Sequence, residues 1–148
     1  MSARTEILLF EASRAEHVEK LIKPALAQGK VVICDRFADS TCAYQGVARA
    51  IDPDTVDSLN AFAMGGAVPD LTVVLDIDPK VGLERARRRD SGRADRMGSE
   101  KIEFYAKVRE GFLKLAEKYP ERIAVVDSSG ERERTFAQIV KAVEGRLP

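Results

Sequence analysis

Three short apolar segments constrain the fold of this chain more than any other feature of its sequence. They lie at residues 31–34, 71–75 and 123–126, and each is followed directly by an aspartate. Strands that are buried on both faces of a parallel sheet have such nearly continuous apolar runs, whereas half-exposed strands alternate between apolar and polar residues. The pattern therefore predicts three parallel strands whose carboxyl ends carry acidic side chains.

The segments between these strands have helical patterns, and one of them has clear signals at both ends. Asp52 is suited to cap a helix over 53–64, Pro53 fits its first position, and two glycines follow it. Alternation of strands and helices predicts the α/β class with a parallel sheet. The predicted helices cover residues 6–28, 53–64, 79–89, 99–118 and 131–145.

Two of the predicted helices show where their apolar faces should lie. Gly29 supplies a C-cap for the first of them, and both have apolar residues at helical spacing. In the first helix these are Leu8, Ala12, Ala15, Val18, Leu21, Ile22, Ala25 and Leu26, and in the fourth Ile102, Tyr105, Val108, Phe112 and Leu115 are expected to point inward.

Composition excludes several classes of protein. A length of 148 residues suits one ordinary domain. The 24 basic and 24 acidic residues cancel, which argues against a dedicated nucleic-acid binder or a polybasic membrane surface. No apolar run approaches the roughly 20 residues that span a bilayer, and the N-terminus has no signal-peptide layout. Cys34, expected to be a buried small hydrophobe, and Cys42 form no disulfide or zinc framework, so the cytoplasm is the expected compartment.

The end of the first predicted strand is a candidate site. Ligands of open α/β sheets bind beyond the carboxyl ends of the strands, where Asp35 is followed by Arg36 and Phe37. A carboxylate can hold Mg²⁺ directly or through water, and a guanidinium can grip a phosphate. The alternative is a local ion pair at a turn.

A cluster of arginines marks a second candidate site. Six of the twelve residues from 85 to 96 are arginine, and Asp90, Ser91 and Gly92 interrupt the helical pattern. Arginine suits multidentate phosphate recognition, and arginines on a closing loop can neutralise a transferring phosphoryl group. The alternative is a solvated, basic helix end that complements the helix dipole.

Two smaller groups also carry possible chemistry. Phe10 and Arg14 lie four residues apart, on one helical face, and could stack on and hydrogen-bond a flat base. The alternative is a core phenylalanine beside a surface arginine. Residues 40–46 group hydroxyls and an amide just after Phe37, either as a binding segment or as a polar surface turn.

Taken in order, the segments LLFEASR, VVICDRFADSTCAYQG, PDLTVVLDID, RARRRDSGRADR and EKYPERIAVVD resemble bacterial thymidylate kinases over essentially the whole chain. These transferases make dTDP from dTMP and ATP. The resemblance implies a P-loop nucleoside monophosphate kinase-like parallel sheet with flanking helices. It implies one domain over 1–148 with a lid at about 86–98, and a cytoplasmic homodimer that binds dTMP and ATP.

The resemblance also implies how the acceptor nucleotide is bound. Phe10 would stack on thymine, Arg14 would donate to a thymine carbonyl, and Thr41 would read the base edge. Tyr44 would crowd the sugar 2′ position and favour deoxyribose, and Gln45 would contact the nucleotide.

Catalytic roles follow from the same resemblance. Asp35 would be the acidic residue that holds Mg²⁺, and Arg36 would grip the acceptor phosphate, with Phe37 where tyrosine is common. The arginine of the lid that stabilises the migrating phosphoryl group would be one of Arg89, Arg93 and Arg96.

The chain departs from the family pattern in one respect: it contains no GxxxxGK[ST] motif, the P-loop that cradles the phosphates of ATP. In the family, the strand before the P-loop lies between the strands predicted at 31–34 and 71–75. Without that strand, three outcomes are possible. The two predicted strands could pair directly with each other, or a second copy of the chain could fill the gap. Alternatively, the chain could belong to a longer protein in which Met1 is an internal residue. We expect the last of these.

The missing motif also leaves the function open to alternatives. We expect that the sequence is that of a thymidylate kinase and that the 148-residue chain by itself does not phosphorylate dTMP. A non-catalytic remnant that binds a deoxynucleotide or another subunit is the alternative. A related nucleoside or nucleotide kinase and a purely structural α/β domain are the other two.

Overall fold

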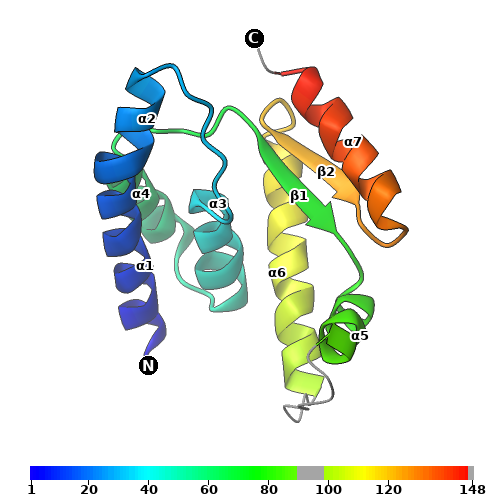
Figure 1. Ribbon diagram of the computed structural model, residues 1–148. Helices are drawn as coiled ribbons and strands as arrows, with labels where there is room; N and C mark the ends of the chain where they lie inside the picture. Colours follow the sequence, from blue (N-terminus) through cyan, green and yellow to red (C-terminus); the bar gives the residue numbers. More distant parts are fainter. Residues whose placement is uncertain (90–98, 147–148) are drawn as a thin grey trace. The chain divides into compact units, whose positions relative to one another are not determined.

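The computed structural model describes residues 1–89 and 99–146 of the chain, which divide into two compact units (Figure 1). Unit 1 covers Met1–Val68 and is helical, and unit 2 covers Pro69–Pro148 and holds a parallel strand pair. The predicted α/β class with parallel strands is confirmed. The prediction of one domain over 1–148 stays a prediction.

Unit 1 begins with three successive helical segments that form one rod. They are α1 (Ala3–His17), the π-helical η1 (Val18–Ile22) and α2 (Lys23–Ala27). The hydroxyl of Ser2 caps the start by accepting a hydrogen bond from the Thr5 backbone N–H at 3.2 Å. Gly29 follows the end with a φ of 70°, a left-handed conformation that glycine adopts without strain. The helix predicted over 6–28 is thus confirmed, with an earlier start.

The buried face of this rod agrees only in part with the predicted one, since Val18 and Ile22 of the predicted face are buried. Ile7, Glu11, Val18 and Ile22 are buried, whereas Leu8, Leu21 and Leu26, which the apolar pattern placed near one face, are exposed. The buried stripe also contains a polar group, Glu11, which accepts a hydrogen bond from Thr41 of another segment of unit 1. Apolar spacing alone gave no indication of such a partner.

The second half of unit 1 follows its local signals closely. Helix α4 (Pro53–Met64) has Asp52 as its N-cap, whose carboxylate accepts from the Thr55 backbone N–H at 2.9 Å, and Gly65 ends it with a φ of 51°. It packs against α1 and against the continuous helix formed by α3 (Ala38–Thr41) and the π-helical η2 (Cys42–Ala48). Val56, Ala63 and Ala43 lie in the core between them.

The strand predicted at 31–34 is wrong. This segment has no regular secondary structure, and Val31 and Ile33 are 71% and 94% exposed. Among the described residues, the sheet has two strands, neither of which includes this segment. An apolar run becomes a strand only when a partner satisfies its backbone N–H and C=O groups, and no segment of the described chain does so for residues 31–34.

Unit 2 is a short α/β layer. Strands β1 (Thr72–Asp76) and β2 (Ile123–Asp127) pair in parallel, with Val74 opposite Val125. The strands predicted at 71–75 and 123–126 are confirmed, although Leu75 and Val125 are exposed rather than buried. With only two described strands, the pair does not bury both faces along its length.

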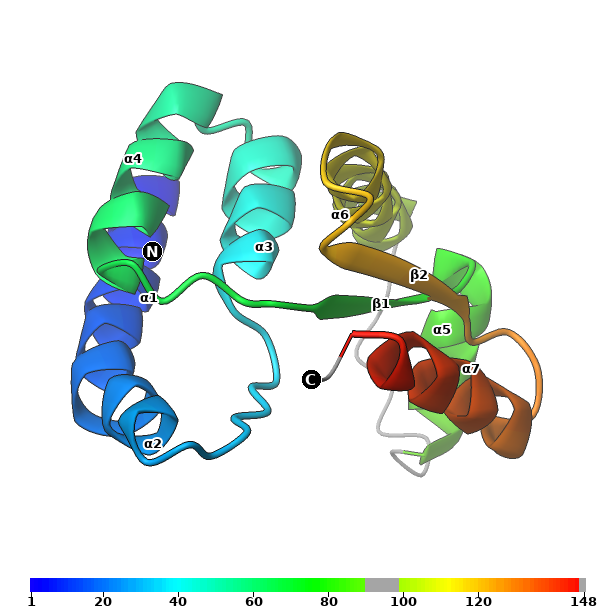
Figure 2. The same ribbon diagram turned by 90° about the horizontal axis from the view of Figure 1, so that it is seen from above.

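Helices flank this strand pair on two sides. Helix α6 (Ser99–Lys118) and α7 (Arg132–Glu144) both pack on β2, from opposite sides of the pair (Figures 1 and 2). Helix α5 (Pro79–Arg89) follows β1 and packs against α6. All three helices agree closely with the predicted ranges. Among the described residues, no helix is both long and apolar enough to cross a membrane.

The two cysteines are free thiols. Cys34 is half-buried rather than buried as expected, because it lies in the exposed segment at 31–34. Burial raises the pKa of the Cys42 thiol to about 11, with the nearby carboxylates of Asp57 and Asp39 adding to the shift. At neutral pH Cys42 is therefore a thiol and a weak nucleophile.

Candidate functional site

A buried guanidinium organises the polar interior of unit 1. Arg14 of α1 donates through Nη2 to the hydroxyl of Thr41 at 2.8 Å and to the carbonyl oxygen of Phe37 at 3.1 Å. Its Nη1 donates to Oδ1 of Asn60 at 3.0 Å and to Glu11. The side chain of Arg14 is 9% exposed, and its guanidinium carbon lies 5.3 Å from the centre of the Phe37 ring. Arg14 therefore ties α1 to α3 and α4.

Glu11 and Asn60 complete this cluster. The Thr41 hydroxyl donates to Oε1 of Glu11 at 2.9 Å, and the Asn60 amide donates to the Ala38 carbonyl oxygen at 3.3 Å. Oε2 of Glu11 is buried and has no hydrogen-bond partner within residues 1–89 and 99–146. Sequence reasoning missed both residues. The three-residue spacing of Glu11 and Arg14 was the available signal for the first, and Asn60 had none because it comes from a distant helix.

The segment after the exposed 31–34 stretch presents a second arginine. Arg36 is exposed, and its guanidinium carbon lies 5.0 Å from the centre of the Tyr44 ring, within cation–π range. Its backbone has a φ of 65°, which is uncommon for a residue other than glycine. The thiol of Cys34 contributes a hydrogen bond to the Arg36 carbonyl oxygen at 3.3 Å.

Gln45, whose contact with the nucleotide stays a prediction, lies inside unit 1. It is buried, and its amide donates to Oε1 of Glu6 at 2.8 Å. This hydrogen bond, together with the nearby Arg49 guanidinium, holds the pKa of Glu6 below its usual value. In this structure Gln45 joins η2 to α1.

The remaining predicted site residues are not joined to these clusters by any hydrogen bond or ion pair described. Phe10 is 54% exposed on α1, and Asp35 is exposed directly after the segment at 31–34. Arg89 is the last residue of α5. Arg93 and Arg96, and with them most of the predicted lid at 86–98, lie outside the described residues.

In unit 2, the carboxyl end of β1 is fixed by an ion pair that sequence reasoning missed. Nε and Nη2 of Arg109 on α6 donate to the two carboxylate oxygens of Asp76 at 2.6 and 2.8 Å. These hydrogen bonds hold the pKa of Asp76 below its usual value. No local pattern links residues 33 positions apart, so the pair became visible only in the fold.

A second arginine of unit 2 holds the loop after β2. Arg85 on α5 donates to the carbonyl oxygen of Ser128 at 2.7 Å and also to that of Ser129. The Ser128 hydroxyl in turn donates to the carbonyl oxygen of Asp76 at 2.9 Å. Hydrogen bonds thus connect the carboxyl ends of β1 and β2 to α5 and α6.

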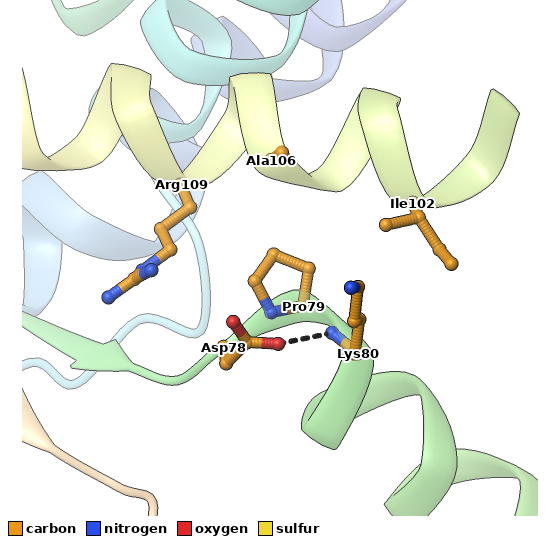
Figure 3. A pocket seen from close by; sticks show the side chains of 6 residues that line it. All are labelled: Asp78, Pro79, Lys80, Ile102, Ala106 and Arg109. Carbon is orange, nitrogen blue, oxygen red and sulfur yellow. Dashed lines mark hydrogen bonds between the residues drawn. The ribbon is translucent and has the colours of Figure 1, made fainter. Parts of the chain in front are cut away.

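Beside this ion pair lies a shallow hollow of about 210 Å³ between the start of α5 and α6. Figure 3 shows Pro79, Ala106 and Ile102 as its apolar walls, with Lys80 and Arg109 at its sides. Asp78 accepts a hydrogen bond from the Lys80 backbone N–H at 2.8 Å. The hollow contains none of the predicted substrate-binding residues.

Carboxylates are sparse where a metal is expected. No group of three or more histidine, cysteine, aspartate or glutamate side chains that could hold a metal ion occurs among the residues described. Asp35 offers a single exposed carboxylate. This donor set fits Mg²⁺, which is commonly bound by one or two carboxylates, waters and substrate phosphates, and it does not fit a metal held by protein ligands alone.

Comparisons with known proteins agree on one family. The family model described as thymidylate kinase matches residues 1–139. Curated proteins named thymidylate kinase include one from Clostridium novyi, 48% identical over 94% of this chain and 68% of its own length. Another, from Geotalea uraniireducens, is 49% identical over 99% of this chain and 71% of its own length. The crystal structure of thymidylate kinase from Ehrlichia chaffeensis superposes with a TM-score of 0.76, is 33% identical, and covers 99% of this chain and 68% of that one.

Proposed function

The chain belongs to the thymidylate kinase family, and we propose that it serves the transfer of the γ-phosphoryl group of ATP to the 5′-phosphate of dTMP, with unit 1 as the dTMP site. One observation carries this proposal. Residues predicted to bind one nucleotide are in contact in pairs: Arg14 with Thr41, which is 27 residues away in the sequence, and Arg36 with Tyr44. A coincidental set of motifs gives no reason for such pairing.

Base recognition in this proposal rests on α1 and α3. The ring of Phe10 is exposed and is therefore available for stacking on the flat ring of thymine. Arg14 and Thr41 supply the polar groups for the base edge. The two terminal nitrogens of Arg14 donate to four protein oxygens, which uses all four of their N–H groups. In this proposal the main role of Arg14 is therefore to fix Thr41, and only its Nε–H is left for the base.

Phosphate recognition rests on Asp35 and Arg36. An exposed guanidinium can bind two phosphate oxygens at once, and Asp35 would hold Mg²⁺ together with the phosphates. When bound, the ion neutralises negative charge on the phosphates. Positioning and charge neutralisation account for most catalysis in phosphoryl transfer, and arginines of a lid contribute to it. Arg89, Arg93 and Arg96 remain our candidates for that role.

The absence of the GxxxxGK[ST] motif from the 148 residues favours a second candidate function. Without that motif, no backbone cradle or lysine of the P-loop type holds the phosphates of ATP. We expect the 148-residue polypeptide to bind dTMP with negligible phosphoryl transfer. Binding without transfer would make it a deoxynucleotide-binding polypeptide of the kinase family. A homodimeric state and a cytoplasmic location belong to the proposal through the family resemblance alone.

Calorimetry combined with a turnover assay tests the proposal. We expect dTMP to bind, and the variant Arg36→Gln to weaken dTMP while leaving thymidine binding unchanged. The variant Phe10→Ala should weaken both ligands equally, because it removes only a contact to the base. Binding of dCMP as strong as that of dTMP would contradict the proposed acceptor. Turnover of dTMP at the roughly 1–100 s⁻¹ of ordinary kinases would refute our account of the missing motif.

A further inference from the structure

The two arginines of the proposed dTMP site have opposite environments. Arg14 is buried and donates to protein oxygens, whereas Arg36 is exposed. Within the described part of the chain, no carboxylate lies within ion-pair distance of Arg36. An exposed arginine that no carboxylate holds can sample many rotamers, and ordering it on binding costs affinity. A phosphate-binding role for Arg36 therefore needs something that holds its guanidinium in place.

The backbone supplies part of this restraint. The left-handed φ of 65° at Arg36 is costly for a residue with a side chain, so it persists only where surrounding contacts enforce it. One such contact is the hydrogen bond between the Cys34 thiol and the Arg36 carbonyl oxygen.

The ring of Tyr44 supplies the other part. Tyr44 is half-buried within η2, a π-helical segment of the kind often found at functional sites. Its ring centre lies 5.0 Å from the guanidinium carbon of Arg36. A ring fixed on a helix gives the mobile guanidinium a flat platform, while the edge of the guanidinium keeps its N–H donors for an anion.

We propose that Tyr44 is a positioning residue for the acceptor phosphate: its ring holds the Arg36 guanidinium where it binds the 5′-phosphate. This inference rests on the proposed function, and it adds to the sugar-reading role that the family resemblance implies. The two roles differ in a measurable way. A ring that reads only the sugar contributes equally to nucleotide and nucleoside binding, whereas a ring that acts through Arg36 contributes only when a phosphate is present.

Affinities for dTMP and thymidine, measured by calorimetry on the 148-residue chain, separate these roles. We expect Tyr44→Leu to weaken dTMP about two- to fivefold more than thymidine, the size of an exposed cation–π contact. Tyr44→Phe keeps the ring and should restore the ratio. In an Arg36→Gln background, Tyr44→Leu should leave the ratio unchanged. Equal losses for both ligands in Tyr44→Leu would overturn the inference.

The chain offers a matched control in unit 2. The ring of Tyr119 lies 5.0 Å from Nζ of Lys118 and 5.2 Å from the guanidinium carbon of Arg122. Tyr119→Leu therefore removes the same kind of ring from beside cations outside the proposed site. We expect it to leave the ratio of dTMP to thymidine affinity unchanged. A shift as large as that of Tyr44→Leu would contradict a specific role for Tyr44.

A spectroscopic measurement keeps this inference separate from the proposed function. The Nε–H resonance of Arg36 should show a ring-current shift in the parent chain and in Tyr44→Phe, and lose it in Tyr44→Leu. Titration with inorganic phosphate, followed on the same resonance, should be about two- to fivefold weaker in Tyr44→Leu. If the parent chain binds neither dTMP nor thymidine, the proposed function fails, and the phosphate titration still decides the inference. Equal phosphate affinity in the two chains would refute it.

Discussion

The buried pair of Glu11 and Arg14 leads to our most quantitative prediction. Their side chains are 6% and 9% exposed, and Glu11 also accepts from Thr41. Replacing Glu11 by leucine leaves the Arg14 charge buried without its partner, and we expect a loss of about 3–5 kcal/mol in the free energy of unfolding. Arg14→Met should lower the free energy of unfolding by a similar amount. It leaves the Glu11 charge buried without its partner and removes the donor to the acceptors on Thr41 and Asn60.

The double variant Glu11→Leu/Arg14→Met should be less destabilised than the sum of the two single variants. It removes both charges together, so neither remains buried alone, and we expect a coupling of about 2–3 kcal/mol. Thr41 and Asn60 still lose their Arg14 donor in the double variant, so it stays below the parent chain in stability.

Urea unfolding followed by a fluorophore in unit 1 measures this coupling. The chain has no tryptophan, and Phe62 on α4 is 86% exposed, so Phe62→Trp provides a reporter at little structural cost. The matched control is the exposed pair of Glu19 and Lys23 on the same rod, for which we expect at most about 0.5 kcal/mol. Additive effects of Glu11→Leu and Arg14→Met, within about 0.5 kcal/mol, would refute the reasoning.

Three further predictions follow from local contacts. The lowered pKa of Asp76 beside Arg109 means that this pair stabilises the fold above about pH 4. That contribution is lost as the pH falls through the folded-state pKa. Urea unfolding between pH 2 and 7 should therefore show that the free energy of unfolding falls more steeply with acid in the parent chain than in Asp76→Asn. Parallel curves for the two chains would contradict this. Gly65→Ala should cost about 1 kcal/mol by thermal unfolding, since φ is 51° and the new Cβ would lie 3.0 Å from Nζ of Lys23; a stabilised variant would show that the turn relaxes. Asp52→Ala removes the cap of α4 and should lower the urea midpoint of unfolding, and an unchanged midpoint would be the contrary result.

Elements whose signals are local could be predicted from the sequence. Asp52, Pro53 and Gly65 set the ends of α4 because a cap needs only residues within one helical turn. The runs at 71–75 and 123–126 became strands because they pair with each other. The same reasoning failed at 31–34, since pairing depends on a partner strand and not on the apolar run itself.

The candidate site divides in the same way. The sequence alone determined that Phe10, Arg14, Arg36, Thr41 and Tyr44 occur in the order and spacing of a nucleotide-binding family, because residue types and motif spacing are written in the chain. Their roles in binding stay predictions. Only the tertiary structure decided that the terminal nitrogens of Arg14 donate to Glu11, Asn60, Thr41 and Phe37, and that the Arg36 guanidinium lies over the Tyr44 ring. The physical reason is that hydrogen bonds and cation–π contacts act over a few ångströms, and the fold brings together segments that the sequence keeps as much as 46 residues apart.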